Sequence, residues 1–315
     1  MLTGKAAAAS VIKRSPEYYF ARHETFHPRH GWLKKGFDAI EKDAAAFAVA
    51  DSHIRLGVGK NMGQAIRYWC LAFKIIEPFD DTGRSGQFQP TGFGSSLLSD
   101  AGWDPYLEDP ASLWHLHWSL NKVPSFATAW GVVFNELRKN EFGVDAIQAE
   151  LVRFRDGRNL GVSENSLQKD ALCILRMYCE QVGTNHISEE SLDCPFASLG
   201  LIQRTADPKL YQFRIGAKAS LPPEIIVSAS MEFMFLTSTN QRTISLAELS
   251  YGTGSPGRVF KLSEASIYDA LEAYAKKSPE ISFSSMAVGS QISTKEAPLL
   301  VARKALEKYY AGKSQ

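Results

Sequence analysis

The residues with the clearest chemical potential lie near the start of the chain, in His23-Glu24-Thr25-Phe26-His27. This His-Glu-x-x-His spacing is that of zinc proteases, where two histidines one helical turn apart bind the metal and the glutamate activates water. Such chemistry requires a helix through both histidines. Pro28 follows at once and Gly31 comes three residues later, so we predict a histidine-rich loop before the first helix and no bound zinc.

A second short motif, Gly57-Val58-Gly59-Lys60-Asn61, partly matches a phosphate-binding loop. The nucleotide-binding pattern needs a glycine five residues before its last glycine and Ser or Thr after the lysine. Ile54 and Asn61 stand at these positions. The sequence therefore predicts no nucleotide cofactor.

The segment around this motif has the periodicity of an amphipathic helix. Met62, Ile66, Trp69 and Phe73 recur at helical spacing, with polar side chains on the other face. A glycine turn precedes it, and segments typical of a small hairpin follow it as far as residue 90. Together they predict a winged helix-turn-helix, in which the second helix reads base edges. The residues expected to contact DNA are Lys34, Lys35, Lys60, Asn61, Gln64, Arg67, Lys74 and Arg84. The simpler alternatives are a solvated helix face or a winged helix that binds protein.

The same pattern occurs again further along the chain. Val144 to Phe154 and Leu167 to Tyr178 each show one apolar helical face, and strand-like alternation follows at 201–204 and 211–215. This predicts a second winged unit, with Asn165, Lys169 and Arg176 on its polar face. Between the two units lie four of the six tryptophans, Trp103, Trp114, Trp118 and Trp130. So much indole surface indicates a packed helical hub, in preference to a base-stacking platform, which would be interleaved with basic residues.

These patterns predict a mainly α fold with small β wings, in which tandem winged helix-turn-helix units are joined by a Trp-rich helical hub. The expected divisions are 1–100, 101–143, 144–236 and 237–315, the last a helical packing or partner module. We expect Asp109 and Ser125 to cap helices and residues 258–262 to form a strand.

The composition is that of an ordinary globular protein, with 44% hydrophobic and 22% charged residues and a net charge of +1. A surface that binds nucleic acid must then be a local basic patch. No apolar run is long enough to span a membrane. Cys70 and Cys173 lie within apolar helical patterns and are expected to be buried thiols, as in a cytoplasmic protein.

Several long motifs resemble one family. These are the His23 segment with Arg29-His30-Gly31-Trp32, the helix from Lys60, residues 103–111 (WDPYLEDPA), residues 164–170 and residues 254–262. They are similar to SspB-type proteins, which are encoded in bacterial DNA phosphorothioation defence clusters beside an ATPase and sulfur-transfer enzymes. The resemblance implies a protein that binds double-stranded DNA and nicks it, so that sulfur can replace a phosphate oxygen.

Nicking requires an activated water, a group that stabilises the pentavalent phosphate and usually Mg²⁺ held by carboxylates. The densest candidates are Glu24 as metal ligand, His23 as base and Arg29 as phosphate clamp, with Asp156 as a weaker second carboxylate. The structural alternative is that the His23 segment only caps the fold. Two other functions remain open at this stage, a non-catalytic DNA-binding adaptor for the sulfur-transfer machinery and a winged-helix transcription regulator.

Overall fold

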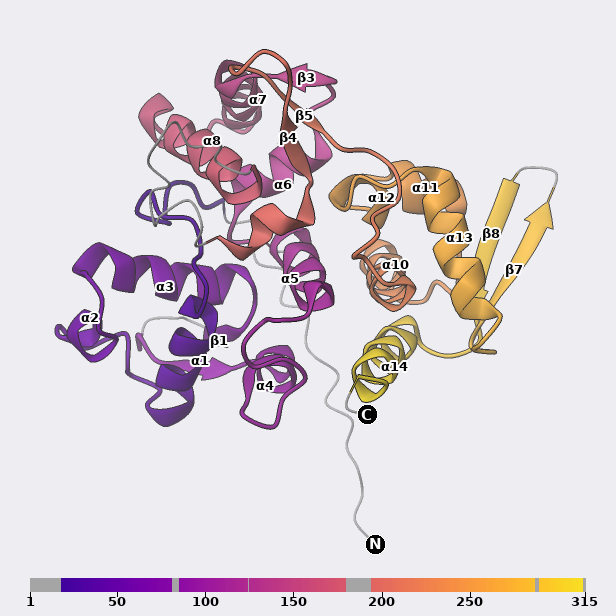
Figure 1. Cartoon of the computed structure of the whole chain (residues 1–315), viewed down its shortest axis with the longest axis horizontal. Coiled ribbons are helices and arrows are strands. Elements are labelled where there is room, and N and C mark those ends of the chain that lie inside the picture. Colours follow the sequence, from indigo (N-terminus) through magenta and orange to yellow (C-terminus); the bar gives the residue numbers. More distant parts are fainter. Residues whose placement is uncertain (1–17, 81–84, 124, 180–193, 287–288, 314–315) are drawn as a thin grey trace, which may run out of the picture.

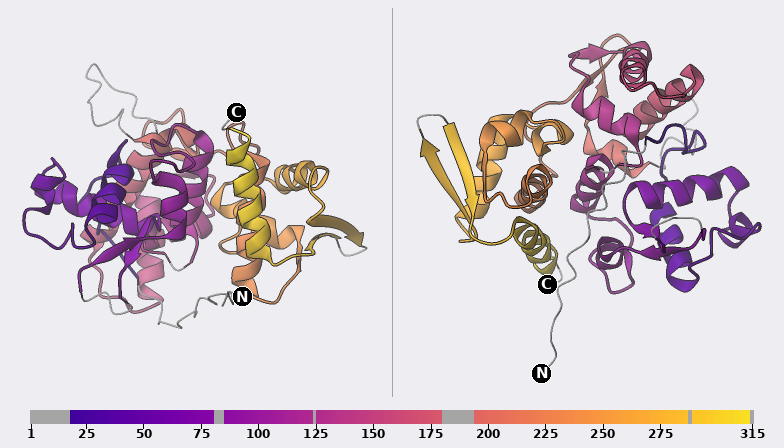
Figure 2. Two further views of the ribbon diagram at one scale, coloured as in Figure 1. Left: turned by 90° about the horizontal axis from the view of Figure 1, so that it is seen from below. Right: turned by 180° about the vertical axis from the view of Figure 1, so that it is seen from behind.

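The computed structural model describes residues 18–80, 85–123, 125–179, 194–286 and 289–313. Its elements form three groups around one central helix, and each group contains a small antiparallel sheet (Figures 1 and 2). A mainly helical fold with small sheets is therefore confirmed. In the described part of the chain, no helix is both long and apolar enough to cross a membrane.

The first group carries the predicted recognition helix and the hairpin that follows it. Strands β1 and β2 pair antiparallel, with Glu77 opposite Gln89. Thr91 caps helix α4, because its hydroxyl accepts a hydrogen bond from the amide of Gly94. In chain order the elements are α1 (Trp32–Lys42), α2 (Ser52–Arg55), α3 (Lys60–Ala72), β1 (Ile76–Pro78), β2 (Phe88–Pro90) and α4 (Gly92–Leu98).

The second group has two long helices and a three-stranded sheet in the order β3-β5-β4. The predicted helices and hairpin are present, and Ser163 caps α8 by accepting from the amide of Ser166. Ser125 does not cap α6, because its hydroxyl bonds Leu120 and Ala127 and the helix begins only at Thr128. The elements are α6 (Thr128–Asn135), β3 (Glu141–Phe142), α7 (Val144–Asp156), α8 (Glu164–Tyr178), the 3-10 helix η1 (Pro195–Leu199), β4 (Ile202–Arg204) and β5 (Tyr211–Phe213).

The third group repeats this order of helices followed by a hairpin, which the sequence analysis did not predict. Its sheet runs β6-β8-β7, and α10 packs against α13 and α14. The strand expected at residues 258–262 is wrong. Ser255 caps a short helix there and Pro256 occupies its first turn. The elements are α10 (Pro223–Thr237), β6 (Thr243–Ser245), α11 (Leu246–Tyr251), α12 (Pro256–Val259), α13 (Glu264–Ala275), β7 (Ile281–Met286), β8 (Gly289–Thr294) and α14 (Pro298–Ala311).

Helix α5 (Pro110–Asn121) lies between the three groups, and every residue from Ala111 to Asn121 is buried. Asp109 caps it as predicted, by accepting from the Ala111 amide. Three of the four hub tryptophans, Trp114, Trp118 and Trp130, are at most 1% exposed, and the half-buried Trp103 stacks on Tyr310. The predicted packing role of this segment is therefore confirmed.

His117 of α5 links two of the groups through its two ring nitrogens. Nδ1 lies 2.7 Å from the hydroxyl of Tyr178 on α8, and Nε2 lies 2.8 Å from the carbonyl oxygen of Val259 on α12. Burial lowers the pKa of His117 to about 3, so the ring is neutral at physiological pH. A neutral ring can donate from Nε2 to the carbonyl and accept at Nδ1 from the tyrosine.

The crossing of α1 and α3 depends on the absence of a side chain at Gly36. A Cβ there would lie 2.4 Å from Cys70 Sγ and 2.9 Å from Ile66 Cγ2, both buried in α3. We expect Gly36→Ala to lower the free energy of unfolding by about 1–3 kcal/mol, because the helices would have to separate. Urea unfolding measures this.

Gly131 is the matched control, since it lies in α6 and a Cβ there meets nothing within 4 Å. Gly131→Ala should raise stability by up to about 1 kcal/mol through helix propensity. If Gly36→Ala is instead as stable as wild type, the close crossing of α1 and α3 is not required.

Candidate nucleic-acid interface

Helix α3 has the two faces that its periodicity predicts. Ile66, Trp69 and Phe73 are fully buried, which confirms their predicted orientation. The polar positions are exposed and none of the residues of α3 is acidic, so the outward face is basic and amide-rich. These exposed residues are Lys60, Asn61, Gln64 and Arg67.

The other basic residues predicted for this surface are mostly used within the fold. Lys34 is buried and its ammonium lies 2.7 Å from both Asp38 and Asp100. Lys35 is exposed and donates to the carbonyl of Leu56 at 2.9 Å. The prediction that Lys34 contacts DNA is therefore wrong, because its charge is already paired within the fold. Arg84 lies outside the described residues.

The prediction that Lys74 contacts DNA is also wrong, because its side chain points into the molecule. Its backbone is left-handed (φ 58°), and its ammonium donates to the carbonyl of Ser119 in the last turn of α5 and to that of Lys122 just after the helix. Burial, followed by repulsion from Lys122, lowers the pKa of Lys74 well below its ordinary value. Lys74 thus joins α3 to the hub.

Helix α8 presents the second predicted polar face. Asn165 and Lys169 are exposed. Arg176 is also exposed, but its guanidinium donates to the carbonyl oxygen of Thr25 at 2.9 Å, which ties the end of α8 to the histidine-rich loop. Glu164 lies at the start of the same helix, so this face is less uniformly basic than that of α3.

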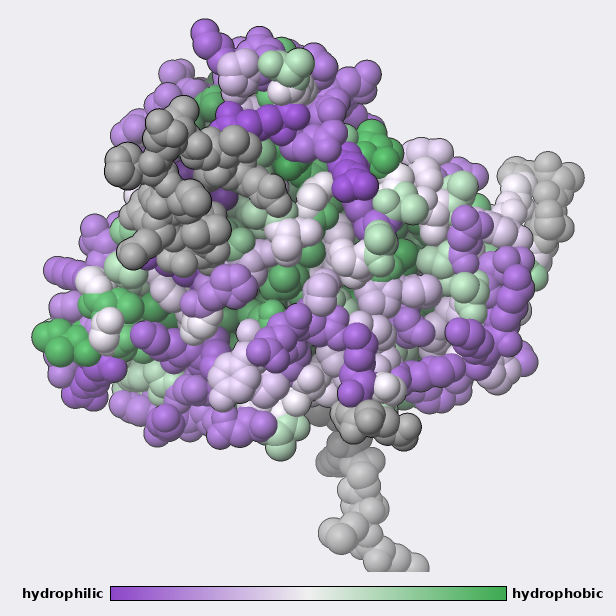
Figure 3. All heavy atoms as spheres, in the orientation of Figure 1, coloured by the Kyte–Doolittle hydropathy of each residue, from purple (hydrophilic) through white to green (hydrophobic). Residues whose placement is uncertain are grey.

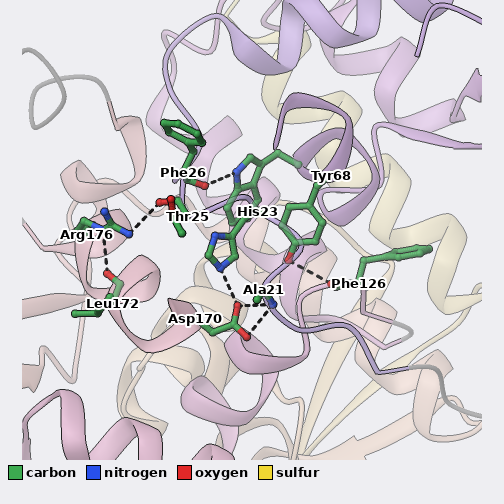
Figure 4. A network of polar contacts seen from close by, with 10 residues as sticks. Ala21, His23, Thr25, Phe26, Tyr68, Phe126, Asp170, Leu172 and Arg176 are labelled. Carbon is green, nitrogen blue, oxygen red and sulfur yellow. Dashed lines mark hydrogen bonds and ion pairs between the residues drawn. The ribbon is translucent and has the colours of Figure 1, made fainter. Parts of the chain in front are cut away.

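The histidine-rich loop lies between α3 and α8 (Figure 4). Its residues form turns rather than a helix, as predicted. His23 is fully buried, and its Nε2 lies 2.8 Å from Oδ1 of Asp170 on α8. The same carboxylate accepts from the amide of Ala21. On the other side the imidazole stacks on Trp69 of α3, with ring centres 6.2 Å apart. We call the His23–Asp170 pair with these contacts the histidine clamp.

The charge state of the clamp follows from its neighbours. Burial alone lowers the pKa of His23, but the adjacent Cys173 and the hydrogen bond and charge of Asp170 outweigh it and raise the pKa to about 10. His23 is therefore a protonated partner of a carboxylate across the neutral range. This corrects its predicted role as a catalytic base, because it is enclosed and holds its proton.

The other predicted catalytic residues do not converge on His23. Glu24 is half-buried in the loop with a left-handed backbone (φ 50°), and the guanidinium of Arg29 lies over the rings of Phe26 and Trp32. Asp156 is exposed and paired with its neighbour Arg155.

Asp156 and Glu24 also lie toward opposite ends of α8. Asp156 ends α7, and Arg155 beside it contacts the carbonyl of Val162 just before α8 begins. Glu24 adjoins Thr25, which is bonded to Arg176 near the far end of α8. The prediction that Asp156 supplies the second carboxylate of a site with Glu24 is therefore wrong. Across the described residues, no three His, Cys, Asp or Glu side chains gather in a way that could hold a metal ion.

The residue that sequence reasoning missed is Asp170. It follows Leu167 by three positions and precedes Ile174 by four, so it falls on the apolar face of α8. A carboxylate at such a position must find a partner inside the fold. The sequence therefore indicates that Asp170 needs a buried partner, but it does not identify His23 as that partner.

A family model and two solved structures match nearly the whole chain. The model of the DUF4007 family, described as a protein of unknown function, matches residues 20–310. An SspB crystal structure has 35% sequence identity and a TM-score of 0.84, covering 94% of this chain and 89% of that chain. A magnesium ion-bound SspB crystal structure has 34% identity and a TM-score of 0.86, covering 93% and 88%. No curated protein matches the sequence.

The clamp is expected to be essential for stability. Asp170→Ala leaves His23 buried without its carboxylate, and breaking a buried charged pair in this way costs about 3–5 kcal/mol. Urea unfolding measures the change. The neighbouring exposed residue provides the control, since Lys169→Ala should change stability by no more than about 0.5 kcal/mol.

The same pair predicts a pH dependence of definite sign. The pKa of His23 is raised from 6.5 to about 10 on folding, so its contribution is complete below about pH 6.5 and is lost as the pH rises through 10. Between these values the free energy of unfolding should fall by up to about 1.4 kcal/mol per pH unit. A slope equal to that of Asp170→Ala would show that the pair is not charged.

Proposed function

The chain belongs to the DUF4007 family and is of the SspB type, and on that premise we propose that it binds DNA and nicks it in a bacterial phosphorothioation defence system. The observation that carries the proposal is the similarity to solved SspB structures along nearly the whole chain. The DNA-binding part has separate support from the residues on α3 and α8.

Helix α3 is the proposed reading helix. It follows α2 through the short turn at residues 56–59 and precedes the β1–β2 hairpin, which is the order of a winged helix-turn-helix. Asn61, Gln64 and Arg67 offer hydrogen bonds suited to base edges, and Lys60 offers a charge suited to a phosphate. Since Lys60 and Arg67 take part in none of the ion pairs between described residues, their charges face the solvent.

The second proposed contact is the exposed face of α8 with Asn165 and Lys169. The histidine clamp holds α3 and α8 in one arrangement, since it contacts Trp69 on the first and Asp170 on the second. Two helices that are fixed in this way can contact neighbouring parts of one duplex. The clamp therefore positions the interface and does not itself contact DNA in this proposal.

For the nicking step, we propose Glu24 and Arg29 as the residues nearest the chemistry. Glu24 supplies a carboxylate in a loop beside the exposed Arg176, and Arg29 is a cation suited to a phosphate. Magnesium, where bound, would stabilise charge on the phosphate. The described residues provide no complete set of ligands, but Mg²⁺ commonly binds one or two carboxylates together with water and substrate phosphate. Glu24 fits such an arrangement.

One observation favours a second function, that of a non-catalytic adaptor. His23 is enclosed and Asp156 lies away from Glu24, so the described residues bring no complete catalytic set together. In this alternative the protein binds DNA and recruits the ATPase and the sulfur-transfer proteins of the same system. A nicking assay on supercoiled plasmid with Mg²⁺ separates the two functions.

Single substitutions on α3 should separate base reading from phosphate binding. Arg67→Ala should cost about 1–3 kcal/mol of binding to a preferred sequence. Lys60→Ala should weaken binding to all sequences alike. It should also reduce the steepness of the slope of log affinity against log salt concentration by about one unit. Fluorescence anisotropy with labelled duplexes measures both, and Arg303→Ala on α14 is the control of equal charge. Unchanged affinity after joint replacement of Lys60, Gln64 and Arg67 would contradict this assignment of α3.

Glu24→Gln tests the catalytic proposal, because it keeps the size of the side chain and removes its charge. Plasmid relaxation should fall by about 10²–10⁴-fold, while DNA affinity and thermal stability persist. Glu41→Gln, on the exposed side of α1, is the matched control and should nick normally. Nicking by Glu24→Gln at the wild-type rate would make Glu24 structural, and a wild-type protein that does not nick would favour the adaptor.

A further inference from the structure

A cavity of about 450 Å³ lies at the junction of the second and third groups. Three chain segments form it: the loop that leaves α6, strand β5 with the residues after it, and Lys261 in the segment between α12 and α13. Figure 3 shows that strongly hydrophilic side chains gather on the upper part of the molecule, where Figure 1 places β3, β4 and β5. The lining includes Arg138, Lys139, Asn140, Gln212, Phe213 and Lys261.

The charged residues that line this cavity are all basic, and the acidic residues Glu136 and Glu141 flank the lining loop in the sequence. Three of its lining residues are basic, and three more cations lie on the same segments. None of these six takes part in any of the ion pairs found between described residues. The six are Arg138, Lys139, Arg214, Lys218, Arg258 and Lys261.

Lys261 is the most enclosed of these cations. Its ammonium donates to the carbonyl oxygen of Phe134 at 2.7 Å and lies 3.8 Å from the ring centre of Phe213. An ammonium has three donors, and this carbonyl occupies one. Burial lowers the pKa of Lys261 to about 7, and repulsion from Arg258, Arg138 and Lys218 adds to the effect. A bound anion would relieve that repulsion.

Two further cations are held in place by backbone carbonyls. Arg258 donates to the carbonyls of Tyr251 and Asn135, both at 2.5 Å. Lys218 donates to three carbonyls, including that of Lys261 at 3.1 Å. Such bonds fix the cations without neutralising them, so the positive field of the cavity is built into the fold.

Arg138 and Lys139 differ from the others, because the fold does not use their side chains. Both are exposed, and within the described chain neither makes a side-chain hydrogen bond or ion pair. A structural role explains Arg258 and Lys218 but not these two. Their place at the cavity, beside the amides of Asn140 and Gln212, indicates a ligand that accepts several charged hydrogen bonds.

We propose that this cavity binds a phosphate group through Arg138, Lys139 and Lys261. Phosphate presents several anionic oxygens, which match a cluster of Arg and Lys donors better than a single carboxylate does. The cavity volume is that of a site for a small ligand of nucleotide size. The phosphate comes either from a DNA backbone, which would add a contact remote from α3, or from a free phosphate compound.

The test replaces the two cations that the fold does not need. Arg138→Gln with Lys139→Gln is compared with Lys276→Gln and Lys277→Gln, which remove the same charge from exposed positions at the end of α13. Inorganic pyrophosphate is titrated by calorimetry, and a labelled duplex is titrated by anisotropy at several salt concentrations. Thermal unfolding of both double variants should match wild type.

If the phosphate is free, pyrophosphate binds wild type at one site and binds the cavity variant at least tenfold more weakly. If it belongs to DNA, the cavity variant loses affinity for all duplexes alike. The steepness of its slope of log affinity against log salt concentration then falls by about two units. The control variant should behave as wild type in both titrations.

Equal behaviour of the cavity and control variants in both titrations overturns the proposal. The DNA outcome rests on the proposed function, whereas the pyrophosphate outcome does not. A protein that binds pyrophosphate through these residues but binds no DNA would keep this inference and refute the proposed function.

Discussion

The hydrogen bond between His23 and Asp170 is the contact on which the arrangement of the first two groups depends. It joins residues 147 positions apart, and neither side chain has access to solvent. A carboxylate and an imidazolium that are buried together are stable only as a pair, because the desolvation free energy of either charge alone would not be offset. The loop that carries His23 is therefore held against α8 on one side and Trp69 on the other.

The central helix α5 imposes a second constraint, since it is covered on all sides. Its polar side chains cannot reach solvent, so the hydrogen bonds that they make are to other parts of the protein. His117 makes such bonds with Tyr178 and Val259, and the indole of Trp118 donates to Glu232 at 2.8 Å. Each bond ends on a different element, so the helix joins the groups as well as filling the space between them.

Charge is distributed unevenly in a protein whose net charge is only +1. Many basic residues are neutralised locally, as Lys34 is by Asp38 and Asp100. On the outward face of α3 and in the lining of the cavity beside Lys261, the described charged side chains are all basic. Local basic surfaces of this kind can exist at a low net charge, because cations and anions are balanced over the whole chain and not at each place.

Local features of the fold could be predicted from the sequence because they depend on neighbours along the chain. The apolar spacing in α3 and α8 determined which faces are buried, and the cap at Asp109 determined where α5 begins. The repeated group at the C-terminal end was missed. Its strands β7 and β8 are rich in serine and have few large apolar side chains, so their alternation is weak. Helix α12 had been predicted as a strand because its Ser-Pro cap was not recognised.

The candidate site was far less predictable, because it depends on distant residues. Residue type alone could not show that Lys34 and Lys74 would be used within the fold while Lys60 and Arg67 stayed exposed. The basic cavity brings together side chains more than a hundred positions apart in the sequence, from Arg138 to Lys261. Periodicity determines which way a side chain faces on its own helix; only packing decides which charge it meets there.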